Sequence, residues 1–414
     1  MRKVFLFIAA ALMVAALAAP ASATNGDNII GVGAISRSMG GVGAAAPQDA
    51  ITAVFGNPAA MCYIPCETSE VDFAATVFDP TVRAKIEVGP ASFEATSLGA
   101  PYAFPAIGIY TPISENWRFG LAAYGVSGLG VDYKDSHLRD TAALLGGARF
   151  DIKTDLQIMK FAPNLSYRIM PNLSVGAALQ VNWAQLDLGD GSSHNFGVGT
   201  QLGVAYIPVD GLHLGLTYQT PQKHTFKRVF NFDAALGDTE RDTLALEQPQ
   251  QVVLGIAYDI IPNMLLVEVD GKWLNWAGAD GYEDFDWEDQ WVAAVGLQAK
   301  PVDWMAIRVG YNYGNNPVKE HDNWNPGGLS TVQGKQTPTL LYEGFRIIGF
   351  PAIVEQHITA GLGVNISKKV SANLGYTHAF SRGIHETSAG GPAAIKLHSS
   401  LRESSYEFGL NIMF

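Results

Sequence analysis

Basic residues on the polar face of alternating segments are the strongest candidates for binding chemistry in this sequence. Arg308 stands between two apolar neighbours, so its guanidinium should point to the opposite, polar face of a strand. Lys160 and Lys272 occupy similar positions. An enclosed cation can bind the carboxylate of a ligand, or it can pair with inward carboxylates of the protein such as Glu268 and Asp270.

Other reactive residues do not combine into a catalytic or metal-binding pattern. The acidic stretch 280–289 could attract divalent cations, but it lacks the spacing of a calcium loop. The Ser/His neighbours at 192–194 and 398–400 have no identifiable third member of a triad. Cys62 and Cys66 are candidates for a disulfide, and no His nearby completes a zinc set. We therefore expect no enzyme activity, no cofactor and no metal site.

The first 23 residues have the pattern of a cleaved export signal. Two basic residues precede an apolar run from 4 to 19, and Ala21-Ser22-Ala23 follows as an A-x-A cleavage site. Cleavage after Ala23 would make Thr24 the first residue of the mature chain. The apolar run is too short for a good membrane anchor, which makes a retained helix the weaker interpretation.

The composition favours an all-β protein, and the net charge argues against nucleic acid as a partner. Hydrophobic residues make up 48% of the 414 residues, charged residues 16%, and there are 44 glycines. Beyond the export signal no segment offers the roughly 20 apolar residues that a membrane helix needs. The net charge of −12 leaves no basic footprint for nucleic acid.

Strict alternation of apolar with small or polar residues predicts β-strands along most of the chain. The C-terminal segment from Tyr406 to Phe414 places five apolar side chains on one face. The same period recurs at 173–183, 201–206, 212–219 and 358–366. A soluble β-sandwich shares this period, but here the other face is rich in Gly, Asn and Gln. That composition suits the lumen of a membrane barrel, with apolar side chains facing lipid.

Short and long connections alternate between these segments, as in outer-membrane barrels. Tight turns are predicted at 111–116, 170–172, 208–211, 262–263, 301–303 and 367–369, and long loops at 128–153, 231–247, 278–286, 315–352 and 382–400. Counting the segments predicts about fourteen strands, an even number as expected for bacterial barrels. Aromatic residues near strand ends, including Trp117, Trp276, Trp287, Trp291 and Trp304, are expected to form interfacial girdles.

The Gly- and Ala-rich segment 24–68 precedes the first convincing strand. A barrel of this size has an interior that must be filled by water or by protein, so this segment is predicted to be a plug. A disordered periplasmic tail is the alternative. We expect three regions: a signal peptide (1–23), an N-terminal hatch (24–68) and a transmembrane barrel (69–414).

The chain resembles the FadL-type outer-membrane transporters of long-chain fatty acids and other hydrophobic compounds. The resemblance begins at 43–50 and continues through 55–61, which contain the hatch-like triplet Asn57-Pro58-Ala59. Further similar motifs lie at 165–176, 214–218, 308–318, 361–363 and 374–378. Each motif alone is weak, and their order and spacing together carry the resemblance.

The resemblance implies a fourteen-stranded barrel, a hatch, and passive uptake of hydrophobic molecules through a lumen pocket and a sideways opening in the wall. It implies that a kinked third strand lies within residues 117–130, where Gly125 and Gly128 could break the strand; ordinary packing on the lumen side is the alternative for these glycines. Arg308 is the candidate for binding a fatty-acid carboxylate. Expected partners are the hydrophobic ligand, outer-membrane lipid and lipopolysaccharide, and the barrel-assembly machinery, and the protein is expected to be a monomer.

Two features depart from the family pattern and keep alternatives open. The loop at 189–195 is short where well-known members have a long one, which puts the capture site and the ligand class in doubt. Cys62 and Cys66 are not part of that pattern. Uptake of alkanes or aromatic hydrocarbons, a surface adhesion or receptor barrel that uses loop 315–352, and a general polar porin are the alternative functions.

Overall fold

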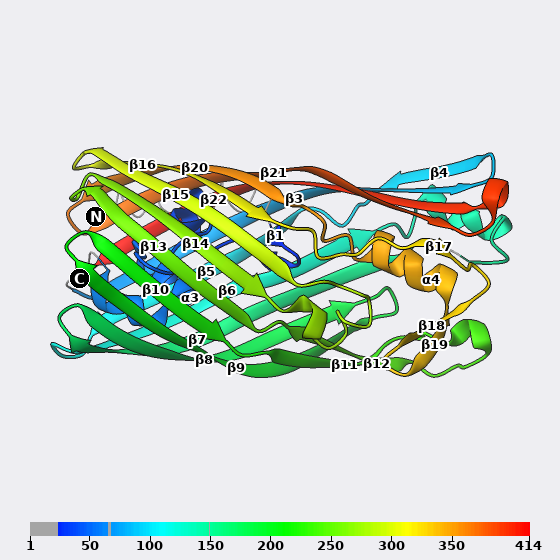
Figure 1. Cartoon of the computed structure of the whole chain (residues 1–414), viewed down its shortest axis with the longest axis horizontal. Coiled ribbons are helices and arrows are strands. Elements are labelled where there is room, and N and C mark those ends of the chain that lie inside the picture. The colour runs from blue at the N-terminus through cyan, green and yellow to red at the C-terminus, as the bar shows by residue number, and fades with distance from the viewer. Residues whose placement is uncertain (1–23, 65–67, 149) are drawn as a thin grey trace, which may run out of the picture.

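The protein is a closed antiparallel β-barrel that surrounds a folded N-terminal segment (Figure 1). The computed structural model describes residues 24–64, 68–148 and 150–414. The predicted signal peptide lies outside these residues.

Fourteen strands form the wall, and each pairs with the wall strands before and after it. The ring closes where the last strand pairs with the first along its whole length. The wall strands are β3 (Glu70–Val88), β5 (Tyr102–Pro112), β6 (Trp117–Asp132), β7 (Lys153–Met170), β8 (Leu173–Asp187), β9 (Ser192–Val209), β10 (Leu212–Gln219), β13 (Gln251–Ile261), β14 (Leu265–Leu274), β15 (Gln290–Val302), β16 (Met305–Gly314), β20 (Gln356–Ser367), β21 (Val370–Ser388) and β22 (Ile395–Met413). The predicted fold class and strand number are confirmed.

The alternation seen in the sequence separates an apolar outer face from a polar inner face. Phe161, Leu179 and Val198 point outward and are exposed, whereas Asn164 and Gln180 point inward and are buried. Outward apolar side chains match the hydrocarbon of a membrane, and inward amides find partners in the lumen.

The two ends of the barrel differ in the length of their connections. The six predicted tight turns all lie at one end, which by the habit of such barrels is periplasmic. At the other end, two loop predictions are partly wrong. Residues 242–248 belong to a hairpin of β11 (Gln222–Phe230) with β12 (Asp242–Gln248), and β21 and β22 extend through most of 382–400. Cross-strand pairing continues there beyond the length that is needed to cross a membrane. The residues of these extensions are polar, so their composition predicted loops.

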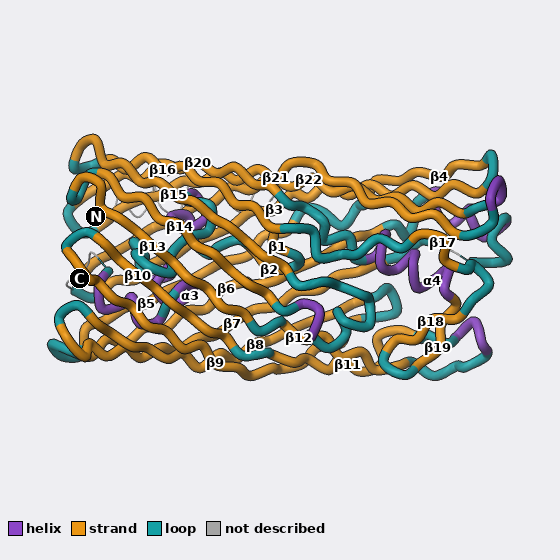
Figure 2. The backbone as a smooth tube through the Cα atoms, in the orientation of Figure 1, coloured by secondary structure: helices purple, strands orange, loops and turns teal. Residues whose placement is uncertain are grey.

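The N-terminal segment fills the periplasmic half of the lumen and is called the hatch. It comprises β1 (Thr24–Asn25), β2 (Asn28–Ile29), α2 (Gly33–Ser38), α3 (Ala50–Gly56) and the 3-10 helix η1 (Pro58–Tyr63). Figure 2 shows these short helices inside the ring of strands. Among the described residues, every helix is too short or too polar to cross a membrane.

Close approach of the hatch backbone explains why the inner face is rich in glycine. A Cβ atom on Gly215 would lie 1.8 Å from the carbonyl oxygen of Ala44, and one on Gly203 would lie 2.1 Å from the side-chain oxygen of Asn57. Only glycine leaves room for a backbone at that distance.

Extracellular segments fold inward and fill the other half of the lumen with apolar side chains. Ile347, Ile348, Phe350 and Ile353 are fully buried, so the long loop predicted at 315–352 packs into the barrel mouth (Figure 1). The segments 275–289 and 315–355 form this outer plug, with η4 (Trp276–Gly278), β17 (Asp322–Trp324), β18 (Leu329–Val332), β19 (Lys335–Pro338), α4 (Thr339–Gly344) and the π-helix η5 (Phe345–Gly349). The other extracellular elements are β4 (Ala91–Thr96), which pairs with β3, and the 3-10 helices η2 (His137–Ala143), η3 (Ala234–Leu236) and η6 (Gly391–Ala393).

Two of the predicted girdle residues belong to this plug. Trp276 and Trp287 are buried and pack against Tyr282, with ring centroids 4.6 and 4.8 Å away. Their sequence positions near strand ends gave no sign that the connecting loop folds into the barrel. Trp117, Trp291 and Trp304 are exposed, as an interfacial position requires.

Candidate functional site

The third wall strand, β6, contains a bulge at its midpoint. Gly125 pairs with Met159 and Ser127 pairs with Ile158, so Val126 is an extra residue with no counterpart on β7. Such an insertion bends the strand and re-aims its side chains. The bulge lies within the predicted kink region, between the two glycines singled out from the sequence.

Pairing between β5 and β6 stops at this bulge. The ladder runs from Pro112 paired with Arg118 to Ala106 paired with Tyr124. Beyond that point, in the described part of the chain, residues 102–105 of β5 pair with β3, and Gly125 and residues 127–132 of β6 pair with β7. The two strands thus part and leave an opening in the wall.

The loop before β5 closes the opening on its extracellular side. The backbone N–H of Leu98 donates to the carbonyl of Asp132 at 2.9 Å, and the N–H of Asp132 donates to the hydroxyl of Ser97 at 2.9 Å. On the lumen side, Asn28 of the hatch pairs with Ser127, and Gly128 N–H donates to the carbonyl of Asp27 at 3.1 Å. Hatch backbone therefore occupies part of the space that the parted strands leave.

An apolar cavity of about 300 Å³ lies at this opening. Its lining joins both strands of the gap to the hatch and includes Phe78, Tyr102, Phe104, Leu129, Ile158 and Ile29. A cavity of that size is at the lower end of the range for small-molecule sites. Ile158, which points inward, and Met159, which points outward, both contribute to the lining, so the cavity lies within the thickness of the wall.

Two aromatic side chains cover the glycines of β6 at the gap. A Cβ on Gly130 would lie 1.8 Å from the hydroxyl oxygen of Tyr102, and a Cβ on Gly125 would lie 3.0 Å from the ring of Phe104. The absence of side chains on β6 thus lets these rings lie across the opening. Gly128 lines the same cavity.

A sequence comparison matches the N-terminal part of the chain to a known family. Residues 12–193 match the family model of the outer membrane protein transport proteins (OMPP1/FadL/TodX). This N-terminal part of the chain is therefore similar to the FadL-type family. The matched residues cover the hatch and the first wall strands, and the closed barrel agrees with an outer-membrane location. A search of curated proteins finds no match.

Solved structures of low sequence identity share the fold along nearly the whole chain. The toluene transporter TodX of P. putida is 19% identical, with a TM-score of 0.67, over 93% of this chain and 99% of that one. A FadL homologue of Pseudomonas aeruginosa is 15% identical, with a TM-score of 0.69, over 94% and 100%. The Ralstonia pickettii toluene transporter TbuX is 17% identical, with a TM-score of 0.62, over 93% and 98%.

Inward carboxylates of the barrel hold the hatch. Asp270 accepts from the backbone N–H groups of Gly43 and Ala44 at 3.1 and 3.2 Å, and Glu268 accepts from Ala45 at 2.7 Å. These carboxylates thus bind hatch backbone, and they do not contact Arg308, as one sequence interpretation had suggested. Charge-assisted hydrogen bonds of this kind are among the stronger ones in proteins.

The hatch triplet forms a joint between the hatch and the wall. Asn57 donates to the carbonyls of Ala44 and Val204 at 2.8 and 3.0 Å, and it accepts from Ala59 N–H at 3.0 Å. Pro58 begins the 3-10 helix, where its missing N–H is not needed. The position fits a hatch motif, whose role in gating stays a prediction.

Lys160 stands alone among amides in the middle of the lumen. Its side chain is buried, and its ammonium donates to Gln180 Oε1 at 3.3 Å and to Gln219 Oε1 at 3.0 Å. Among the described residues no carboxylate lies within ion-pair distance of it. Nearby, the Tyr124 hydroxyl and both ring nitrogens of His224 are buried without a hydrogen-bond partner in the described part of the chain. Alternation placed Lys160 inward, but sequence could not show that it would lack a counter-charge.

Arg308 and Cys62 both contact polar side chains of the barrel wall. Arg308 is buried and donates to Gln298 Oε1 at 2.6 Å and to Asn373 Oδ1 at 2.8 Å, so both of its partners are neutral amides. Its role as a carboxylate ligand stays a prediction. The Cys62 sulfur lies 2.8 Å from the Ser166 hydroxyl. Cys66 lies outside the described residues, so the predicted disulfide is untested.

An aromatic groove opens near the extracellular end. Phe150, Phe232, Phe285 and Phe345 contribute to its lining, and its volume is about 210 Å³. Lys134 and Lys153 are also part of the lining. The groove forms although the loop at 189–195 is short, because the plug supplies aromatic side chains from other segments.

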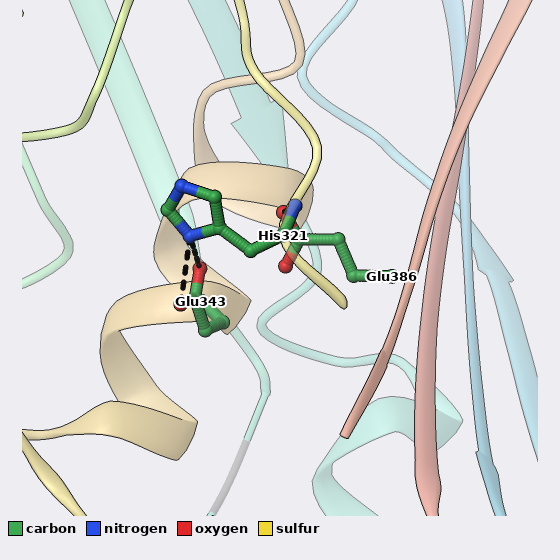
Figure 3. A group of neighbouring side chains, drawn as sticks. All are labelled: His321, Glu343 and Glu386. Carbon is green, nitrogen blue, oxygen red and sulfur yellow. Dashed lines mark hydrogen bonds and ion pairs between the residues drawn. The ribbon is translucent and has the colours of Figure 1, made fainter. Parts of the chain in front are cut away.

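A buried ion-pair cluster fastens the plug to the barrel extension. His321 Nδ1 lies 3.0 Å from Glu343 Oε1, and the Glu386 carboxylate approaches from β21 (Figure 3). Arg346 Nη1 donates to both carboxylates, at 2.7 and 2.8 Å. One His and two Glu within 4.8 Å resemble a metal ligand set. However, the guanidinium of Arg346 already balances the two carboxylates, so we interpret the cluster as a structural contact that holds the plug to the barrel.

His321 should make the stability of the plug depend on pH. Hydrogen bonding to Glu343 raises the pKa of His321 above its ordinary value of about 6.5. The extra stability is therefore fully present below the ordinary pKa and is lost as pH rises through the raised pKa. Thermal unfolding followed by heat-modifiable gel mobility should show a midpoint that falls between pH 6 and 9.

The His321→Gln variant should lose this component of the pH dependence. His137→Gln is the control, because that imidazole is exposed at 87%. An equal slope in wild type and His321→Gln would contradict the assignment.

Proposed function

We propose that this protein takes up long-chain fatty acids or similar amphiphilic acids and releases them sideways into the outer membrane. The apolar tail would pass from the extracellular groove through the lumen to the cavity at the β5–β6 opening. Each buried CH₂ group contributes about 0.8 kcal/mol to the transfer from water. The gradient of the ligand would suffice to drive the process.

The isolated ammonium of Lys160 is the observation that supports an acid as the ligand. A buried charge without a counter-charge is costly, and proteins normally pair it. The carboxylate of an acid ligand would supply the missing negative charge. It would accept the hydrogen bonds that Lys160 otherwise donates to the two glutamines. A hydrocarbon has no polar head, so Lys160 would keep its hydrogen bonds to the two glutamines.

Aromatic hydrocarbons are the second candidate, and the compact cavity at the opening favours them. At about 300 Å³, with Phe78, Tyr102 and Phe104 in its lining, it suits a single-ring compound without rearrangement. A long acyl chain would have to displace some of the hatch or the aromatic rings. Both candidates use the same route and differ in their need for Lys160.

Uptake by cells that lack their own transporters separates the two candidates. Cells expressing wild type, Lys160→Met or Lys160→Arg are given radiolabelled oleate and, separately, radiolabelled toluene. A charge-assisted hydrogen bond contributes about 1.5–3 kcal/mol, so Lys160→Met should lower oleate uptake by roughly 10- to 100-fold at limiting ligand. Lys160→Arg should retain most of it, and toluene uptake should not change.

Lys85→Met is the matched control, because Lys85 is a partly exposed lysine paired with Glu87 outside the lumen. Oleate uptake that survives in Lys160→Met would contradict an acid site at Lys160. Uptake of toluene alone by a folded wild-type protein would favour the hydrocarbon function.

A further inference from the structure

The first residue of the predicted mature chain lies inside the barrel. Thr24 is 3% exposed and is part of the cavity lining at the opening. Its backbone nitrogen lies 3.2 Å from Glu403 Oε2, and its hydroxyl lies 3.2 Å from Glu403 Oε1. If the export signal is removed after Ala23, this nitrogen is the α-amino group of the protein.

Glu403 has no other strong donor among the residues that the structure describes. It projects inward from β22 and is 2% exposed. Arg37 is the nearby cation, but its guanidinium is bound to Glu407 at 2.7 Å and to Ser405 at 2.8 Å. An ionised carboxylate in this position is stabilised by a positive partner, because a buried charge left unpaired destabilises the fold.

We propose that removal of the signal peptide creates an ammonium at Thr24 that forms a buried ion pair with Glu403. In the precursor the same nitrogen is an amide, which carries one N–H and no charge. Processing would therefore supply both the charge and the additional donors that Glu403 lacks. The pair would form only after the peptide bond between Ala23 and Thr24 is cut.

The ion pair fixes a short hairpin that crosses the lumen to the wall opening. Thr24 pairs with Ile29, and Asn25 pairs with Asn28. The hairpin then reaches β6, where Asn28 pairs with Ser127. At its tip, the buried carboxylate of Asp27 accepts a hydrogen bond from the Tyr282 hydroxyl of the outer plug. Processing of the N-terminus is thus linked to closure of the opening, whichever compound is transported.

Reactivity of the α-amine tests the proposal directly. Purified wild-type protein in detergent is treated at pH 7 with an acetylating N-hydroxysuccinimide ester, digested with trypsin, and the peptide 24–37 is quantified. Intact mass should show a chain that starts at Thr24. The amine of the folded protein should react at least tenfold more slowly than that of the urea-unfolded protein.

Three variants distinguish the contribution of the Thr24 ammonium from that of the Thr24 hydroxyl. Glu403→Gln should raise the acetylation rate at least fivefold, whereas Thr24→Ala should keep the protection because it leaves the amine in place. Inserting Gly-Ser between Ala23 and Thr24 moves the ammonium away from Glu403, so its amine should react freely and the unfolding midpoint should fall. This insertion tests the pair even if Glu403→Gln fails to fold.

Three results would overturn the proposal. The first is a mature chain that starts at another residue. The second is a folded wild-type amine that reacts as fast as the unfolded one. Unchanged protection in a folded Glu403→Gln variant would likewise exclude the ion pair as its cause.

Discussion

Deletion of Val126 should abolish uptake of hydrophobic compounds and leave a folded barrel. Val126 is the one residue of β6 without a counterpart on β7, so its removal lets the two strands pair without interruption. A straight β6 can continue its ladder with β5 beyond Ala106, and paired backbones leave no sideways exit. We expect uptake of oleate or toluene to fall at least tenfold, to the level of cells without the protein.

A deletion of Gly237 provides the matched control. Gly237 lies in an extracellular turn, and nothing lies within 4 Å of a Cβ built there, so the loop can shorten without a change in the wall. Heat-modifiable mobility should show that both variants fold. Normal uptake by the folded Val126 deletion would contradict the assignment of the opening as the exit.

Replacement of Arg37 with Met should release the hatch and let ions pass. Arg37 and Glu407 are both fully buried and lie 2.7 Å apart, so the variant leaves a buried carboxylate without its cation. Breaking such a pair costs about 3–5 kcal/mol. The guanidinium also binds the hydroxyl of Ser405 on the wall and the carbonyl of Gly31 within the hatch, so the variant loses one more contact between hatch and wall and one inside the hatch.

Single-channel recording in planar bilayers measures the release of the hatch. Wild type should conduct rarely, and Arg37→Met should show open events at least tenfold more often. Arg402→Met is the control, because Arg402 lies on the same strand as Glu407 but faces outward and is exposed. Equal conductance of wild type and Arg37→Met would mean that this ion pair does not retain the hatch.

The wall of the barrel could be predicted because its two faces meet different surroundings. In the C-terminal strand, Tyr406 and Phe408 face outward whereas Glu407 is buried, as the alternation requires. The tight turns followed from Pro and Asn, whose local geometry needs no tertiary information. The strand extensions within 382–400 were not predicted because they lie outside the membrane, where polar residues can also form paired strands.

The opening could be predicted only in part. Gly125 and Gly128 flank the bulge of β6, and their role in a sideways opening stays a prediction. Glycines also line the lumen wherever the hatch comes close, as at Gly215. The extra residue Val126 is visible only when β6 is paired with β7. A bulge is a property of two strands, so one strand's sequence does not locate it.

Binding groups in the lumen depend on partners that are distant in sequence. Alternation placed Arg308 and Lys160 inward equally well. Arg308 has Asn373 among its partners, 65 residues away, and Lys160 has Gln219, 59 residues away. Nothing in the sequence distinguishes a lysine that meets glutamine from one that meets glutamate.

Photo-crosslinking tests the sideways route most directly. Intact outer membranes containing the wild-type protein are incubated with a long-chain fatty acid that carries a diazirine in its tail, irradiated, and analysed by peptide mass spectrometry. We expect adducts on residues of the opening, in particular Phe104, Leu129 and Met159, and a marked loss of these adducts in the Val126 deletion. Adducts confined to the hatch and the periplasmic turns, and unchanged by the deletion, would contradict sideways release and point to a path through the hatch.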